Sequence, residues 1–324
     1  MVFKKLLGSL GVGGPTVDTV LRSGGAVPGG ELSGEVRLKG GNADFTIEHI
    51  TLELVARVEA EHEDGEAEGF VAFERFTVAG GFVLPEGEEH AIPFGVTLPW
   101  ETPVTELHGQ DLGIVLGVRT ELSVAGAKDK GDLDRLTVRP LPAQEAVLEA
   151  LGRLGFGFRS ADLELGHIRG SGQLLPFYQE IELSPAPRYA GRVEEIEVTF
   201  LAGPAGVEVV LEADRRAGLF SGGGDALGRL TVGHHEVESR DWASELDDRL
   251  RSMADAHASH GAPEPYGHDG GRPSHHSGPG MGTAVAAGAA GLAVGVVGGM
   301  VAAEVVDEVG DFFEDEEEVE GGED

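Results

Sequence analysis

Apolar and polar residues alternate along most of the first 140 positions, in short runs separated by turn residues. Glu31–Leu38 alternates after the turn Pro28-Gly29-Gly30, and Phe45–Val58 is a longer run of the same kind. A period of two predicts strands with one buried face, and short strands at close spacing are typical of an antiparallel β-sandwich. Inward positions of the longer run pass from Ile47 to Ile50, so a β-bulge is expected at His49.

Further strands of this first lobe are expected over residues 70–78, 81–84, 90–98 and 114–124. The acidic run 59–69 is expected to be a hairpin loop.

A helix opens the second half of the body. Pro140 and Pro142 interrupt the strand pattern, and over Ala143–Leu154 the apolar residues share one helical face until Gly155 ends the helix. Strands are then expected over 160–165, 170–174, 179–183, 194–201, 206–213 and 229–232, and a helix over 241–257 closes the body. The pattern therefore predicts an all-β chain with two tandem antiparallel β-sandwiches, residues 1–140 and 141–257, and short helices.

Three segments of different composition follow the body. Residues 258–282 are rich in His, Gly and Pro and are interpreted as a linker, although its histidines could also chelate a metal loosely. Residues 283–303 are uncharged and rich in Ala, Gly and Val, and Gly291, Gly295 and Gly299 recur every fourth residue. Such a ridge of small residues lets two helices approach closely. Residues 304–324 form an acidic tail.

The Gly/Ala-rich segment 283–303 has three possible interpretations. As a helix it is long enough to cross a bilayer, but Ala and Gly gain little from entering lipid. Membrane association, pairing with another helix (for example in a homo-oligomer) and a plain linker therefore all remain alternatives.

The chain is strongly acidic, with 57 Asp+Glu against 24 Lys+Arg and a formal net charge of −33. Binding of phosphates needs clustered Lys and Arg, so no nucleic-acid partner is expected. The absence of cysteine excludes disulfides, thiolate metal sites and cysteine nucleophiles. Glycines interrupt the apolar N-terminal stretch and no cleavage site follows it. No signal peptide is therefore expected, and the chain is predicted to be cytoplasmic.

Two short basic segments are candidate contact sites. Phe3, Lys4 and Lys5 lie in a short amphipathic stretch that could contact a partner or a membrane surface, or pack on the body. Arg215 and Arg216 could bind an acidic partner motif or form local ion pairs.

No motif of an enzyme is found. The glycine-rich stretches lack the context of phosphate-binding loops, and no nucleophile-elbow pattern is present. The adjacent histidines His234 and His235 would point to opposite faces of a strand, which disfavours a shared metal. No catalytic residue, cofactor or metal ligand is therefore assigned.

Several segments together resemble the bacterial sporulation-control (SpoOM) family. They include Thr16–Val20, Gly34-Glu35-Val36, Leu98–Pro103, Leu175–Glu182 and Glu212–Arg216, in order over roughly residues 1–250. The resemblance implies an arrestin-like fold of two tandem β-sandwiches without enzymatic activity, acting through protein contacts in developmental control.

The expected function is accordingly that of a non-catalytic protein-interaction module in sporulation or cell development, with protein partners that the sequence does not identify. One alternative is a membrane-tethered scaffold anchored by residues 283–303. Another is a metal-dependent hydrolase with scattered Asp, Glu and His ligands.

Overall fold

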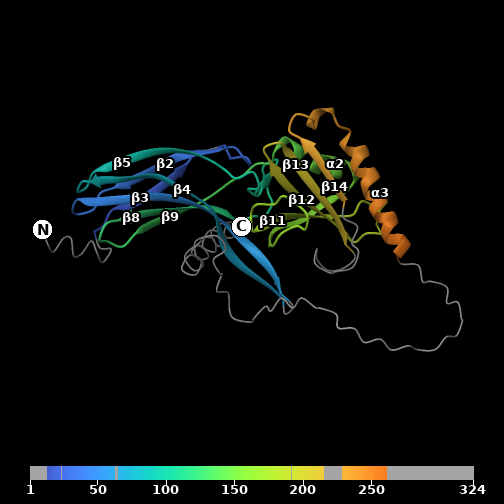
Figure 1. Cartoon of the computed structure of the whole chain (residues 1–324), viewed down its shortest axis with the longest axis horizontal. Helices are drawn as coiled ribbons and strands as arrows, with labels where there is room; N and C mark the ends of the chain where they lie inside the picture. Colours follow the sequence, from blue (N-terminus) through green and yellow to red (C-terminus); the bar gives the residue numbers. More distant parts are fainter. Residues whose placement is uncertain (1–12, 23, 63–64, 191, 215–227, 261–324) are drawn as a thin grey trace, which may run out of the picture.

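The computed structural model describes residues 13–22, 24–62, 65–190, 192–214 and 228–260. Two strand-rich lobes lie end to end along the molecule (Figure 1). The strands are β1 (Thr16–Leu21), β2 (Glu31–Lys39), β3 (Phe45–His62), β4 (Gly65–Leu84), β5 (Glu89–Thr97), β6 (Glu106–Leu107), β7 (Gln110–Asp111), β8 (Leu116–Val124), β9 (Lys130–Arg135), β10 (Gly157–Leu165), β11 (Phe177–Ser184), β12 (Glu195–Gly203), β13 (Gly206–Asp214) and β14 (Gly228–Gly233). The helices are α2 (Pro142–Leu154), η1 (Val237–Ser239) and α3 (Trp242–His260).

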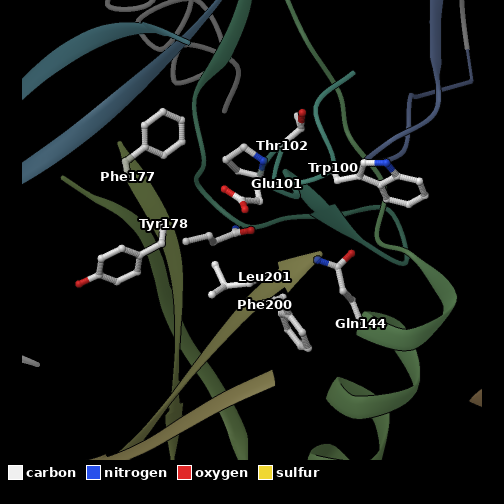
Figure 2. A pocket seen from close by; sticks show the side chains of 10 residues that line it. Trp100, Glu101, Thr102, Gln144, Phe177, Tyr178, Phe200 and Leu201 are labelled. Atoms are coloured by element: carbon white, nitrogen blue, oxygen red, sulfur yellow. The ribbon is translucent and has the colours of Figure 1, made fainter. Parts of the chain in front are cut away.

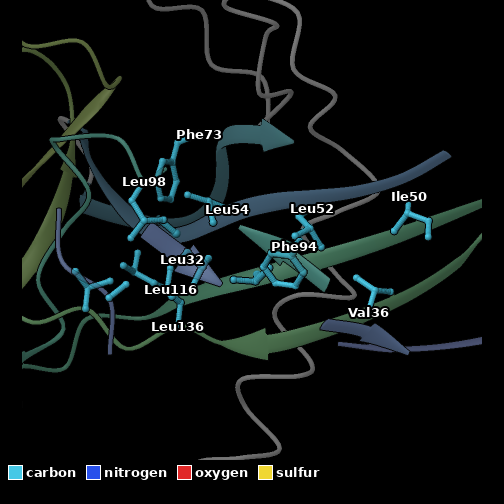
Figure 3. Packing of buried hydrophobic residues seen from close by; sticks show 14 of the residues in the cluster. Leu32, Val36, Ile50, Leu52, Leu54, Phe73, Phe94, Leu98, Leu116 and Leu136 are labelled. Carbon is cyan, nitrogen blue, oxygen red and sulfur yellow. The ribbon is translucent and has the colours of Figure 1, made fainter. Parts of the chain in front are cut away.

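The first lobe is a sandwich of two sheets. The antiparallel sheet β1-β2-β5 faces strands β9, β8, β3 and β4 across an apolar core, part of which is shown in Figure 3. Val36 of β2, Leu52 of β3 and Leu116 of β8 are each no more than 1% exposed. Burial of each such side chain stabilises the fold by about 1.5–3 kcal/mol, so the alternating pattern itself holds the sheets together.

The predicted bulge at His49 is confirmed. Ile47 of β3 pairs with Val124 of β8, and His49 pairs with the adjacent Ser123, so β3 carries one extra residue. The extra residue restores the inward orientation, because Ile47 and Ile50 are both fully buried on either side of it.

The prediction of an acidic hairpin loop over residues 59–69 is wrong. Strands β3 and β4 stay paired from Phe45 and Leu84 to the tip at His62 and Gly65, and the two strands expected over 70–84 are one. At the start of the acidic run, apolar and acidic residues still alternate, and Ala60 is only 9% exposed. The second lobe contacts the base of this part of the hairpin, where Glu164 of β10 pairs with Glu59. From there the hairpin projects away from the two lobes in Figure 1.

The second lobe is built on the antiparallel strands β10 to β14, in sequence order. Helices α2 and α3 pack on one face of this sheet around a second apolar core. Helix α2 begins one residue before its predicted start and ends at Gly155, which has a left-handed φ of 97°. The strand expected over 170–174 is wrong, because these residues form a turn and loop between β10 and β11.

The two lobes share both a sheet and a core. Strand β10 runs parallel to β3, with Glu164 opposite Glu59, and this links β10–β14 to β3, β4, β8 and β9 in one sheet. The ring of Phe73 meets that of Phe177 edge-on at 5.4 Å, and Phe177 belongs to the core of the first lobe. A rotation of one lobe against the other would therefore expose apolar surface. The chain is mostly β, which confirms the predicted fold class.

Candidate interaction site at the junction of the lobes

Two segments that are far apart in the sequence meet where the lobes join. Val104 follows the segment Leu98–Pro103, and its backbone N–H donates to Oε1 of Gln179 on β11 at 2.9 Å. Nε2 of Gln179 donates in return to the carbonyl of Val104 at 2.8 Å. This reciprocal pair gives both the N–H and the carbonyl of buried Val104 a partner and joins the two segments at the junction.

The hollow at this junction is small. Trp100, Glu101, Phe177, Tyr178 and other residues line it (Figure 2), and its volume is about 10 Å³. That is about the space of one water molecule, whereas ligand pockets measure about 300–1,000 Å³. The hollow at the junction is therefore too small to hold a ligand of ordinary size.

A fixed loop lies beside this hollow. The side chain of Gln173 accepts a hydrogen bond from the N–H of Ile168 at 2.9 Å and donates to the carbonyls of Gly166 and Leu175 at 2.7 and 2.8 Å. The carboxylate of Glu101, from the first lobe, accepts hydrogen bonds from the N–H groups of Leu174 and Leu175. Residues 166–176, which we call the junction loop, are thus held from within and from the other lobe.

The junction loop presents an apolar side chain to solvent. Leu174 is 85% exposed, although its backbone is fixed, while Leu165 at the end of β10 is 43% exposed. Single exposed leucines are common on protein surfaces. Here, however, the neighbouring backbone is fully organised, so ordering it on binding would cost little entropy.

Strands β10–β14 carry acidic residues on the face that points away from helices α2 and α3. Asp162 pairs across the strands with Glu180, and Glu197 lies between Glu182 and Glu212. Burial raises the pKa of Glu180 to about 10, with further contributions from Glu197, Asp162, Glu164 and Glu212. Burial also raises the pKa of Tyr178 well above its usual value, with further contributions from Glu180, Glu164, Glu197 and Glu212. Glu180 is therefore protonated at neutral pH.

Two groups of side chains have the spacing of metal ligands within the described part of the chain. The first is Asp162, Glu164 and Glu180 on the acidic face. The second is His108, Glu145 and Glu149, at the contact between the lobes.

The contact residues expected from the sequence lie outside the described residues. These are Phe3, Lys4, Lys5, Arg215, Arg216, Gly291, Gly295 and Gly299. Most of the linker, the Gly/Ala-rich segment and the acidic tail lie outside them too. In the part of the chain that is described, no helix is both long and apolar enough to span a bilayer.

The sequence did not point to the residues that build the junction. Glu101 and Gln179 lie in segments that carry the family resemblance, but the sequence assigned no role to them or to Gln173 and Leu174, because these roles depend on contacts with distant segments. His234 was placed on a strand but lies in the turn after β14. There its Nε2 contacts the carbonyl of Gly203 at 2.8 Å and its ring stacks on Trp100 at 5.1 Å.

Comparisons with known proteins point to one family. The family described as SpoOM protein matches residues 3–217. The sporulation-control protein spo0M of Bacillus subtilis (strain 168) is 36% identical over 265 residues, which cover 79% of this chain and 98% of that protein. The crystal structure of Spo0M from Bacillus subtilis is also similar, with a TM-score of 0.66 and 33% identity, over 76% of this chain and all of that one.

Proposed function

Because the chain belongs to the SpoOM family, whose relative is named for sporulation control, we propose that it is a non-catalytic protein-interaction module in the control of sporulation or cell development. Family membership supports the role in sporulation control. At the junction, a hollow of about 10 Å³ leaves no room for a substrate, which supports interaction rather than catalysis at that place. The proposed site of action is the cytoplasm, as predicted from the sequence.

The observation that carries this proposal is the fixed presentation of Leu174. Its side chain is 85% exposed while Glu101 and Gln173 hold the backbone of the junction loop. Transfer of a leucine side chain from water into an apolar pocket contributes about 1.5–3 kcal/mol. We therefore propose that a partner protein receives Leu174 in an apolar pocket and contacts the junction loop around it.

The test replaces this side chain without disturbing the loop. Leu174→Asp is introduced into the chromosomal copy, and development of the strain is scored beside a deletion strain. Proximity labelling from the same protein identifies its neighbours. Leu174→Asp is expected to reproduce the deletion phenotype and to lose specific neighbours, since a charge cannot enter an apolar pocket without a large desolvation cost.

Val83→Asp is the matched control, because Val83 on β4 is also an exposed aliphatic residue (55%) but lies on the first lobe. It should leave development and labelling unchanged. Thermal melting of both purified variants checks that they fold. Full complementation by a folded Leu174→Asp protein would refute the proposed docking site.

The membrane-tethered scaffold remains an alternative prediction, which rests on the uncharged segment 283–303. Fractionation of cells that express the full chain, compared with a chain ending at residue 258, tests it. Recovery of the full chain in the membrane fraction and of the shorter chain in the supernatant would support an anchor. Equal recovery of both in the supernatant would contradict it.

A further inference from the structure

A histidine of the first lobe lies against two glutamates of helix α2, which opens the second lobe. Nδ1 of His108 is 3.1 Å from Oε1 of Glu145, and Nε2 of His108 is 3.6 Å from Oε1 of Glu149. One ligand atom from each of the three residues lies within 4.8 Å of the other two. No local pattern groups these three residues, because His108 is separated from the helix by more than thirty residues.

The backbone of His108 is held in an uncommon conformation. Its φ is 54°, and among the described residues it is the one non-glycine residue with a positive φ. It forms a two-residue turn with Gly109, φ 78°, between the short strands β6 and β7. Asn and Gly are the usual residues where both φ angles are positive. An imidazole is thus kept over α2 at a position that favours a smaller side chain.

The two glutamates form a concentrated negative charge. Glu145 and Glu149 are one helical turn apart on the same face of α2, where like charges repel. Arg153 pairs with Oε2 of Glu149 at 3.3 Å and leaves Oε1 facing the imidazole. One arginine balances one of the two carboxylates, and a second positive charge would be favourable between His108 and the helix.

We infer that His108, Glu145 and Glu149 bind a divalent transition-metal ion of the Zn²⁺ class, which fastens the β6–β7 turn of the first lobe to α2 of the second. One imidazole nitrogen and two carboxylate oxygens are a suitable ligand set for such ions. The three ligand atoms, one from each residue, lie within 4.8 Å of one another, so small side-chain shifts would bring them to a single ion with bonds of about 2.1 Å. All three side chains are partly exposed, so water can complete the coordination.

Other histidines of the described body lack this arrangement. His90 pairs with Glu88 at 2.9 Å and its ring stacks on Phe82. The pair His49–Glu121 is 3.9 Å apart. Neither belongs to a group of three ligands. His90 therefore serves as a matched control, with an exposed His–Glu pair but no third ligand.

The experiment measures thermal unfolding of the full chain after removal of metal with a chelator, in a titration with zinc chloride. A ligand that binds the folded state raises Tm. Wild-type protein should gain a few degrees at saturating zinc, and Mg²⁺, which prefers all-oxygen sites, should give a much smaller shift. His108→Asn should abolish the zinc-dependent shift while preserving the turn, since Asn is favoured there. Glu149→Gln should greatly reduce it.

His90→Asn should keep the full zinc response. Histidines of the segment 257–276 are present in every variant, so zinc bound there cannot produce a difference between them. Binding of zinc without any rise in Tm of the wild type, or an equal rise in His108→Asn, would overturn the inference. In either case the three residues would form an ion-pair cluster only.

Discussion

The strands of the second lobe form a sheet whose two faces differ in chemistry: one is apolar and covered by helices, and the other carries carboxylates. On the face that meets α2 and α3, Val198, Val209 and Leu211 have no exposed surface and pack in the apolar core. On the other face, Glu180, Glu197 and Glu212 stand on adjacent strands. The apolar face stabilises the fold at any pH, whereas the energy of the acidic face depends on protonation.

The largest effect is expected on the apolar face. Leu211→Ala removes a side chain with no exposed surface and leaves a cavity beneath the helices. Unfolding in urea should show a loss of about 4 kcal/mol, in the upper part of the range for buried leucines. Leu174→Ala, at an exposed leucine, is the control and should change stability by less than about 0.5 kcal/mol. Equal losses of unfolding free energy in Leu211→Ala and Leu174→Ala would contradict the prediction that the cost follows the burial of the leucine.

The next effect should appear on the acidic face and depend on pH. The pKa of Glu180 is about 10 in the folded chain, above its ordinary value of 4.5. The folded state therefore binds a proton that the unfolded state releases, and stability falls as pH rises between these values, by about 1.4 kcal/mol per pH unit. Glu180→Gln, a neutral side chain of the same shape, should remove this slope.

Urea unfolding at pH 4.5 and pH 7 measures this difference. The two proteins should be equally stable at pH 4.5, and Glu180→Gln should be more stable at pH 7 by up to about 3 kcal/mol. Glu31→Gln, at an exposed carboxylate of β2, is the control and should follow the wild type at both values. If Glu180→Gln also followed the wild type, Glu180 would be ionised in the folded chain.

A polar residue in line with the apolar face gives a smaller effect. Gln179 lies on the same face of β11 as Phe177 and Ile181, and its amide exchanges two hydrogen bonds with the backbone of Val104. Gln179→Leu should cost about 2 kcal/mol, because it leaves a buried N–H and a buried carbonyl without partners. Urea unfolding checks this value, and a neutral result would mean that water replaces the lost amide.

The smallest effect is expected at the edge of the acidic face. The hydroxyl of Ser160 donates to Glu182 at 2.6 Å, and both residues are partly exposed. Water can replace this hydrogen bond, so Ser160→Ala should cost about 0.5–1 kcal/mol in the same assay. A loss as large as that of Leu211→Ala would contradict the proposed division between the faces.

The local pattern was enough to predict most elements. Alternation located β2 and the bulge at His49, and the apolar stripe followed by Gly155 located α2. The prediction failed at a segment whose composition is typical of a loop but whose neighbours in the fold keep it extended. The acidic run after Val58 looks like a loop by composition, yet β10 pairs beside it and it continues as strand.

The sequence by itself determined the class of fold and the family, because strand periodicity, turn residues and family segments are local properties of the chain. Tertiary structure alone decided the candidate sites. It joined Gln179 to Val104, fixed Leu174 through Glu101, and placed His108 over α2. Each of these contacts links residues that are distant along the chain, and no local pattern encodes which distant residues will meet when two apolar faces are buried together.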